Sequence, residues 1–360
     1  MQCIPHTERD TNKMIDEATI RAKEYKRNKL IFRALILISV IGFVWFAYDM
    51  QGKPYTGDEM YHYKQASMVA HGQLPYRDFT IHYGPAWVML WGNAYKVTGE
   101  SKAASRAIGA ALWAVFFLST FFLVAAFAGR MAAVIFQIIM QVFFTEFQMF
   151  CIASYMFVLP ASLAIILCLT KYYETEDNRY IAAIAGLTLF ILAFRVDTAI
   201  LMTVCVAVML KLDAKKTGIY LGMVIIPALL AGVWLTQYVP VPRLMESFND
   251  IKSTLGDFHD KFPAGMIGDT LPRMFLKIPM YTPFIMIGIA GYLYLRHLHI
   301  SKTVGYIQYV RKQHIPLPLF IAVIAMYLNQ IFYSCDVNHA ILANYFAMIL
   351  GVYILSKGRG

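Results

Sequence analysis

Charged residues are scarce in this chain of 360 residues: Asp, Glu, Lys and Arg together make up 15% of it. Hydrophobic residues make up 59%, and the mean hydropathy is +0.53. One soluble core cannot bury that much apolar side-chain surface, so the composition excludes an ordinary soluble domain. We therefore expect an all-α polytopic membrane protein.

Several familiar motifs are also lacking. The five cysteines form no Cys-x-x-Cys pair and no metal-ligand spacing, and Cys168 and Cys205 fall in apolar stretches, where a free cysteine is usually a core residue. The sequence has no P-loop and no Gly-x-Gly-x-x-Gly motif, which argues against a pump driven by ATP. It also contains no repeat of fixed period and no low-complexity tract.

The formal net charge of +10 would suggest a nucleic-acid partner if the protein were soluble. Here the Lys and Arg residues cluster in short segments between apolar stretches. This distribution is typical of membrane topology, in which basic residues stay on the cytoplasmic side. We expect membrane lipids, and no nucleic acid, around this chain.

Apolar stretches predict about ten transmembrane helices, each close to the roughly 17–25 residues that cross the hydrocarbon core. They cover residues 31–50, 107–129, 131–149, 152–170, 180–194, 198–212, 217–238, 278–295, 317–333 and 340–355. The stretch 180–212 is divided into two spans because it is too long for one untilted crossing. A single crossing there would also place Lys211 on the outer side and invert every later loop.

Basic residues set the expected orientation. Residues 1–30 form a basic cytoplasmic arm, residues 31–355 the transmembrane domain, and residues 356–360 a cytoplasmic tail. No secretory signal peptide is recognisable at the start. The segment 16–29 is either a solvated arm or a surface helix on anionic lipid. We expect an integral protein of the plasma (inner) membrane with both termini inside.

This orientation places every cluster of polar residues on the outer face. The clusters are the first outer loop (residues 51–106), the FRVDT turn at 194–198, the outer loop 239–277 and the SCDVNH turn at 334–339. The loop 239–277, which has an amphipathic piece near 244–258, is either a lid over a site or an ordered connector.

The first outer loop contains the longest polar interruption of the apolar pattern. Residues 60–71 and 86–97 have helical composition, and turn residues separate them. We expect two short helices along the membrane surface, with Trp87, Trp91 and Tyr95 as interfacial anchors. Ionisable groups at a membrane boundary are costly, so their presence here indicates a functional site.

Asp58 and Glu59 follow the first span directly. Adjacent residues point about 100° apart on a helix and to opposite faces on a strand, so the two carboxylates do not converge on one atom. A carboxylate at a dry boundary has a raised pKa and is suited to take a proton from a hydroxyl. Spacing alone favours equally an N-cap for the helix expected near Met60.

Further polar pairs lie in the outer segments. Arg77 and Asp78 either pair with each other to fix the loop or contact a substrate, and His82 either bonds a sugar hydroxyl or a backbone carbonyl. Arg195, two residues before Asp197, either binds a phosphate in bidentate fashion or extends to the lipid headgroups.

Asp336 and His339 share a helical face at the start of the last span and either bind a phosphate or a metal. Two ligands are too few to define a metal site.

The motifs of the first outer loop resemble a known family. An acidic pair after the first span is followed by Ala66, Gly72, the PYRDF of 75–79 and the YGP of 83–85. This pattern resembles the membrane-embedded glycosyltransferases of the C superfamily (GT-C), near the protein O-mannosyltransferase and aminoarabinose-transferase branch. The FRVD of 194–197 and the Asp-x-x-His of 336–339 are similar to motifs of bacterial members. The sequence departs from many relatives in having Gly-Pro for Pro-Pro and no additional soluble outer domain.

The resemblance implies inverting transfer of a sugar from a polyprenyl-phosphate donor to an acceptor hydroxyl on the outer face. It implies no nucleotide donor, no cofactor and no required metal. The acceptor is a glycan, a lipid or a protein. The roles implied are catalytic for Asp58 (the general base), Glu59 and Asp78; donor phosphate binding for Arg195, His339 and Asp336; and substrate binding for Tyr61, His62, Arg77, His82, Tyr83 and Asp197.

Two other functions are compatible with a polytopic chain. A secondary transporter or flippase would place its charges near the midplane and often has repeated halves, neither of which the sequence indicates. A ligase or polymerase that moves a whole glycan has the same outer-face requirements as a sugar transferase.

Overall fold

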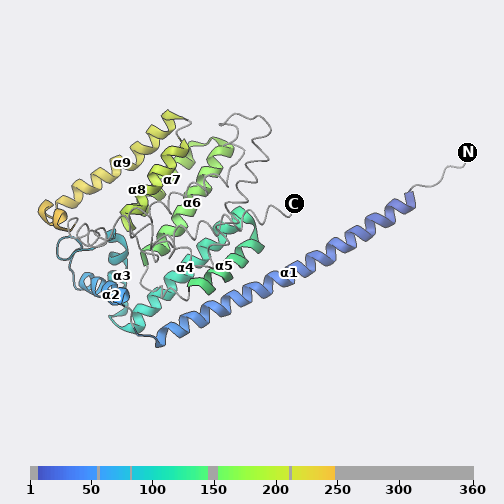
Figure 1. Ribbon diagram of the computed structural model, residues 1–360, viewed down its shortest axis with the longest axis horizontal. Coiled ribbons are helices and arrows are strands. Elements are labelled where there is room, and N and C mark those ends of the chain that lie inside the picture. The colour runs from blue at the N-terminus through green and yellow to red at the C-terminus, as the bar shows by residue number, and fades with distance from the viewer. Residues whose placement is uncertain (1–6, 55–56, 82, 145–152, 211–212, 248–360) are drawn as a thin grey trace, which may run out of the picture.

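A computed structural model describes residues 7–54, 57–81, 83–144, 153–210 and 213–247 of the chain, and these are nearly all helical. The helices are α1 (Thr7–Gly52), α2 (Gly57–Ala70), α3 (Pro85–Thr98), α4 (Lys102–Ala128), α5 (Arg130–Phe144), α6 (Ala153–Thr175), α7 (Asn178–Phe194), α8 (Val196–Leu210) and α9 (Ala214–Thr236) (Figure 1). Residues 241–247 are also helical. The last three expected spans and most of the loop 239–277 lie outside the described residues.

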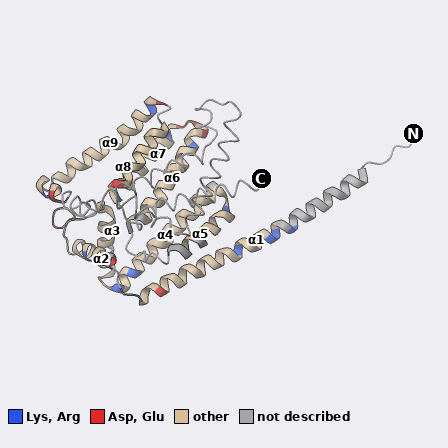
Figure 2. Ribbon diagram, in the orientation of Figure 1, with Lys and Arg blue, Asp and Glu red and all other residues tan. Residues whose placement is uncertain are grey.

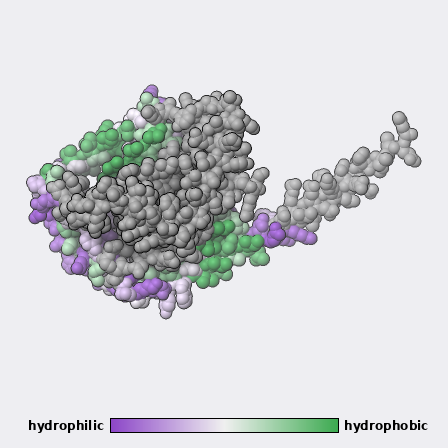
Figure 3. Space-filling view, viewed as in Figure 1, coloured by the Kyte–Doolittle hydropathy of each residue, from purple (hydrophilic) through white to green (hydrophobic). Residues whose placement is uncertain are grey.

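Four of the described helices contain a segment long and apolar enough to cross a membrane. The segments are Tyr25–Gly52, Lys102–Ala126, Met156–Thr175 and Ala214–Thr236, and α7 and α8 are shorter apolar helices. Large apolar side chains stay exposed along α9, and Figure 3 shows hydrophobic surface over its visible part. These lengths and this apolar character are consistent with an integral membrane protein, and the described residues are nearly all helical. The prediction of about ten spans stays a prediction, because the last three expected spans lie outside the described residues.

The first helix is longer than expected. α1 runs through 46 residues without interruption and projects from the rest of the molecule (Figure 1). At 1.5 Å per residue it is about 69 Å long. The basic segment 16–29 is therefore the direct continuation of the first span. The segment is thus helical, and no helix-breaking residue separates it from the apolar one. Its contact with anionic lipid stays a prediction.

The predicted division of 180–212 is confirmed, since α7 ends at Phe194 and α8 begins at Val196. The Tyr173 hydroxyl at the end of α6 donates a hydrogen bond to the carbonyl oxygen of Met209 at the end of α8 (3.0 Å). The end of α8 thus returns to the level at which α7 begins. The two helices are antiparallel, and Arg195 stands in the turn between them.

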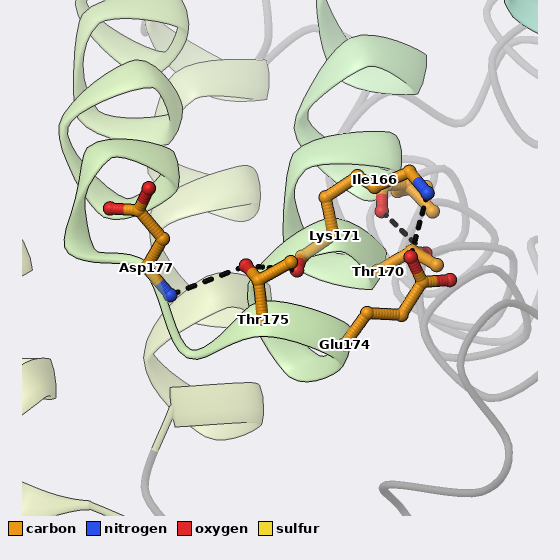
Figure 4. A network of polar contacts seen from close by, with 6 residues as sticks. All are labelled: Ile166, Thr170, Lys171, Glu174, Thr175 and Asp177. Atoms are coloured by element: carbon orange, nitrogen blue, oxygen red, sulfur yellow. Dashed lines mark hydrogen bonds and ion pairs between the residues drawn. The ribbon is translucent and has the colours of Figure 1, made fainter.

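The opposite end of the bundle contains the α6–α7 connection. Two polar contacts stabilise this connection. Lys171 pairs with Glu174 (2.6 Å), and the N–H of Asp177 donates to the Thr175 hydroxyl (3.3 Å) (Figure 4). Lys216 at the start of α9 donates to the side-chain oxygen of Asn178. The two basic connections expected on one side of the membrane therefore lie together. Figure 2 shows charges near helix ends and along α1, with uncharged helix middles between them.

Local sequence signals explain the helix ends. Ser101, Asp177 and Asp213 cap α4, α7 and α9, each accepting a hydrogen bond from a backbone N–H of the first turn. Pro85 opens α3 directly after Gly84, where a missing N–H costs nothing. Pro160 and Pro227 lie inside α6 and α9, as membrane helices allow.

The two helices of the first outer loop pack together and against the bundle. Trp87, Trp91 and Tyr95 lie four residues apart on α3, and all three are buried. Tyr95 contacts the ring of Tyr63 on α2. The prediction that these three rings are interfacial anchors is therefore wrong. Their spacing is that of a helix face, and this face turns towards the protein.

Gly92 allows α3 to approach α2. Replacing it with Ala is expected to lower the free energy of unfolding by about 1–3 kcal/mol. The added Cβ would stand 2.5 Å from the Cβ of Val69 and 2.7 Å from the carbonyl oxygen of Ala66. Thermal unfolding in detergent micelles measures the change.

Gly186 of α7 is the matched control, because no atom lies within 4 Å of a Cβ built there. Its replacement with Ala is expected to leave stability equal or raise it by roughly 0.5–1 kcal/mol. Equal responses at the two glycines would contradict the close packing of α2 on α3.

Candidate functional site

The first outer loop and the FRVD turn, which are 110 positions apart when counted from Gly84 to Phe194, meet at one end of the bundle. The backbone N–H of Gly84 donates a hydrogen bond to the carbonyl oxygen of Phe194 (2.9 Å). A Cβ at position 84 would collide with the carbonyl group of Ala193. Glycine is thus required for this approach, and the expectation that the two motifs share one face of the bundle is confirmed for these residues.

Arg195 and Asp197 form a fork-shaped ion pair in this turn. The Nε of Arg195 donates to Oδ1 of Asp197 (3.0 Å) and Nη2 donates to Oδ2 (2.6 Å). The Arg195 side chain is only 6% exposed. Its guanidinium carbon lies 4.8 Å from the centre of the Tyr83 ring. Arg195 therefore faces the first outer loop, and the interpretation that it extends to lipid headgroups is wrong.

Aromatic rings connect Tyr83 to both loop helices. The His62 ring of α2 lies 5.8 Å from that of Tyr83 and 4.5 Å from that of Trp87 on α3. The Tyr61 ring contacts the His62 ring, and burial raises the pKa of the Tyr61 hydroxyl. Of the residues predicted to bind substrate, Tyr61, His62 and Tyr83 thus form one cluster with Arg195.

A tight turn precedes this cluster. Tyr76 has a positive φ of 65°, and its hydroxyl donates to the carbonyl oxygen of Tyr83 (2.9 Å). Burial raises the pKa of Tyr76 to about 12, so this hydroxyl stays protonated as a donor at neutral pH. The turn therefore supports the backbone of Tyr83 through this hydrogen bond.

Asp78 organises the same turn. Its carboxylate accepts hydrogen bonds from Arg77 (2.8 and 2.9 Å) and from the backbone N–H of Leu74 (2.7 Å). The Arg77 guanidinium, followed by the Leu74 amide, lowers the pKa of Asp78. The structure therefore confirms the alternative in which Arg77 and Asp78 pair with each other and fix the loop. Both side chains stay exposed, and their contact with a substrate remains a prediction.

Glu59 has a partner that the sequence reading missed. Its Oε2 accepts a hydrogen bond from Nη2 of Arg106 on α4 (2.9 Å), and the two side chains are 6% and 0% exposed. Nη2 of Arg106 also reaches the carbonyl oxygen of Pro54 (3.4 Å). The pair fixes the first turn of α2 on α4. A substrate role of Glu59 remains a prediction, now beside this structural one.

Arg106 directly precedes the apolar stretch 107–129, so the sequence places it at the end of the first outer loop and names no partner for it. The signal available in the sequence was position: Arg106 falls within the first turns after Ser101, the N-cap of α4, and α4 continues as a membrane span. A basic residue there has to find a partner inside the protein or extend to the surface.

Asp58 is a first-turn residue of α2, which begins at Gly57. The interpretation of Asp58 as the N-cap is therefore wrong, because a cap precedes the helix. His82, Asp336 and His339 lie outside the described residues.

Within the described ranges, no group of three or more His, Cys, Asp or Glu side chains is placed to hold a metal ion. The expectation that no metal is required stays a prediction.

Comparisons with known proteins bear on the fold alone. No protein-family profile matches the chain, and no curated protein matches it. Among solved structures it is similar to an oligosaccharyltransferase from Archaeoglobus fulgidus, crystallised with zinc and sulfate, with a TM-score of 0.52 and 14% identity. The similarity covers 89% of this chain and 49% of the archaeal one, so this chain spans about half the length of that protein. The likeness supports a GT-C-like fold.

The Glu59–Arg106 pair generates a stability prediction. Arg106→Met is expected to lower the free energy of unfolding by about 3–5 kcal/mol, because it leaves a buried carboxylate without its counter-charge. The double variant with Glu59→Met is expected to lose less than the sum of the two single variants. Chemical unfolding in micelles measures the three differences.

Lys171→Met serves as the control, since its pair with Glu174 is exposed at the other end of the bundle. It is expected to change stability by no more than about 1 kcal/mol. Additive losses at Glu59 and Arg106 would show that the pair contributes no coupling.

Proposed function

We propose that this protein transfers a sugar from a polyprenyl-phosphate donor to an acceptor hydroxyl on the outer face of the membrane. The observation that carries the proposal is the fold shared with an oligosaccharyltransferase. The junction of the first outer loop with the FRVD turn adds support, because these are the segments whose motifs resemble the GT-C glycosyltransferases.

Asp58 is the proposed general base. It takes the proton of the acceptor hydroxyl while the oxygen attacks the anomeric carbon and the polyprenyl phosphate leaves from the opposite side, so the configuration inverts. Position 58 lies about 100° around the helix axis from position 59. The buried contact of Glu59 with Arg106 therefore anchors the turn on one side, which supports unequal roles for the two neighbouring acids.

The donor phosphate accumulates negative charge as it leaves. Preorganised cations and hydrogen-bond donors lower the free energy of such a transition state by several kcal/mol, on the order of 3 for one donor. His339 is proposed to donate to the phosphate at this end, and Asp336, three residues before it, is proposed to orient the His339 ring. The sequence also predicts that Arg195 binds the donor phosphate. Its guanidinium contacts the Asp197 carboxylate and the Tyr83 ring, and these contacts weaken the case for that role.

A second candidate is the transfer of a whole glycan. The structural neighbour is an oligosaccharyltransferase, and its name specifies an oligosaccharide as the group transferred. A transporter has less support, since the buried ion pairs of the described residues, Glu59–Arg106 and Arg195–Asp197, lie at one end of the bundle.

Asp58→Asn is expected to lower the transfer rate by at least about 10²-fold, the usual contribution of a positioned general base, and to leave the unfolding temperature nearly unchanged. Purified protein is incubated with a panel of polyprenyl-phosphate sugars and lipid-linked oligosaccharides, with and without EDTA, and released polyprenyl phosphate is measured.

Asn93→Asp, which adds a carboxylate at an exposed position of α3, is the control and is expected to keep the wild-type rate. Near-normal turnover of Asp58→Asn would remove Asp58 as the base. Activity on oligosaccharide donors alone would select the second candidate, and loss of activity in EDTA would refute metal independence.

A further inference from the structure

We infer that Arg195 is a positioning residue: together with Asp197 it holds Tyr83, and through Tyr83 the helix α2, against the turn between α7 and α8. We call the group Tyr83, Gly84, Phe194, Arg195 and Asp197 the latch. The inference rests on the proposed function for its kinetic consequence and on geometry alone for its structural one.

The Arg195 guanidinium makes two contacts within the latch. Two of its nitrogens donate to the two carboxylate oxygens of Asp197, and its guanidinium carbon lies 4.8 Å from the centre of the Tyr83 ring. A buried Arg needs such contacts to offset its lost hydration. Lys has no planar fork, so it cannot pair in bidentate fashion with a carboxylate while it lies against an aromatic ring.

This arrangement differs from that of a phosphate ligand. The carboxylate of Asp197 occupies the Nε and Nη2 side of the guanidinium, one of the two sides on which a phosphate binds in bidentate fashion, and it is only 15% exposed. A donor phosphate at this fork would have to displace a carboxylate of the same charge. Direct binding of the donor by Arg195 is therefore disfavoured by like-charge repulsion.

The latch reaches the proposed base through the chain of ring contacts. Tyr83 contacts His62, and His62 lies four residues after Asp58 on α2, so positions 58 and 62 share one helix face. The hydrogen bond from the backbone N–H of Gly84 to the carbonyl oxygen of Phe194 fixes the residue directly after Tyr83. Loosening the latch would thus shift the helix that carries Asp58 without removing any reacting group.

Hydrogen exchange and kinetics test the latch together. Arg195→Lys and Tyr83→Leu are expected to speed amide exchange in residues 73–84 at least tenfold and to leave exchange in α4 unchanged. Both variants are also expected to lower kcat by about 10²-fold with the donor KM within about threefold, the pattern of misplaced catalytic geometry. Tyr83→Phe keeps the ring and is expected to keep the wild-type exchange.

Arg179→Lys is the matched control, because it makes the same change from Arg to Lys at the opposite end of α7, where the Arg179 side chain is exposed. It is expected to change neither exchange nor kinetics. A raised donor KM in Arg195→Lys with unchanged exchange in residues 73–84 would overturn the inference and make Arg195 a donor ligand. If Arg195→Lys fails to fold, Tyr83→Leu, which leaves the ion pair intact, decides by the same two measurements.

The exchange experiment needs no substrate, so the two proposals fail separately. Absence of transfer by the wild-type protein would refute the proposed function and leave the latch tested by exchange. Unchanged exchange in Tyr83→Leu would refute the latch whatever the activity.

Discussion

The approach of the first outer loop to the bundle depends on one backbone contact, between the N–H of Gly84 and the carbonyl oxygen of Phe194. A side chain at position 84 would meet the carbonyl group of Ala193, so glycine is what allows this contact. The second attachment of the loop is the buried Glu59–Arg106 pair near its beginning. With both in place, α2 and α3 are held at the same end of the bundle as the FRVD turn, and the polar residues of two distant segments become neighbours.

The length and apolar character of the spans predicted much of the described fold. The division between α7 and α8 was also predictable, because charge placement on the two sides of a membrane restricts the number of crossings. The environment of individual side chains was not. Trp87, Trp91 and Tyr95 have the composition of an interfacial belt, and only the packing of α3 shows that their face turns to the protein. Likewise, the lack of a helix-breaking residue between the basic and apolar segments of α1 permits one continuous helix but does not require it.

For the candidate site, the sequence predicted which residues gather but not which of them touch. Motif resemblance selected Asp58, Tyr83 and Arg195, and the structure places Tyr83 and Arg195 in contact. The partner of Glu59 was missed because Arg106 stands 47 positions away, and pairing at that distance follows from tertiary packing alone. The Arg77–Asp78 pair was foreseen as one of two alternatives, since adjacent opposite charges in a turn need no long-range information.

The uninterrupted course of α1 has a mechanical consequence. Its basic half and its apolar half form one rod without a joint, so neither half can change its inclination independently of the other. The rod ends at Gly52, five residues before α2 begins. The inclination of the basic half therefore sets the direction in which the chain leaves α1 at Gly52 and enters the first outer loop.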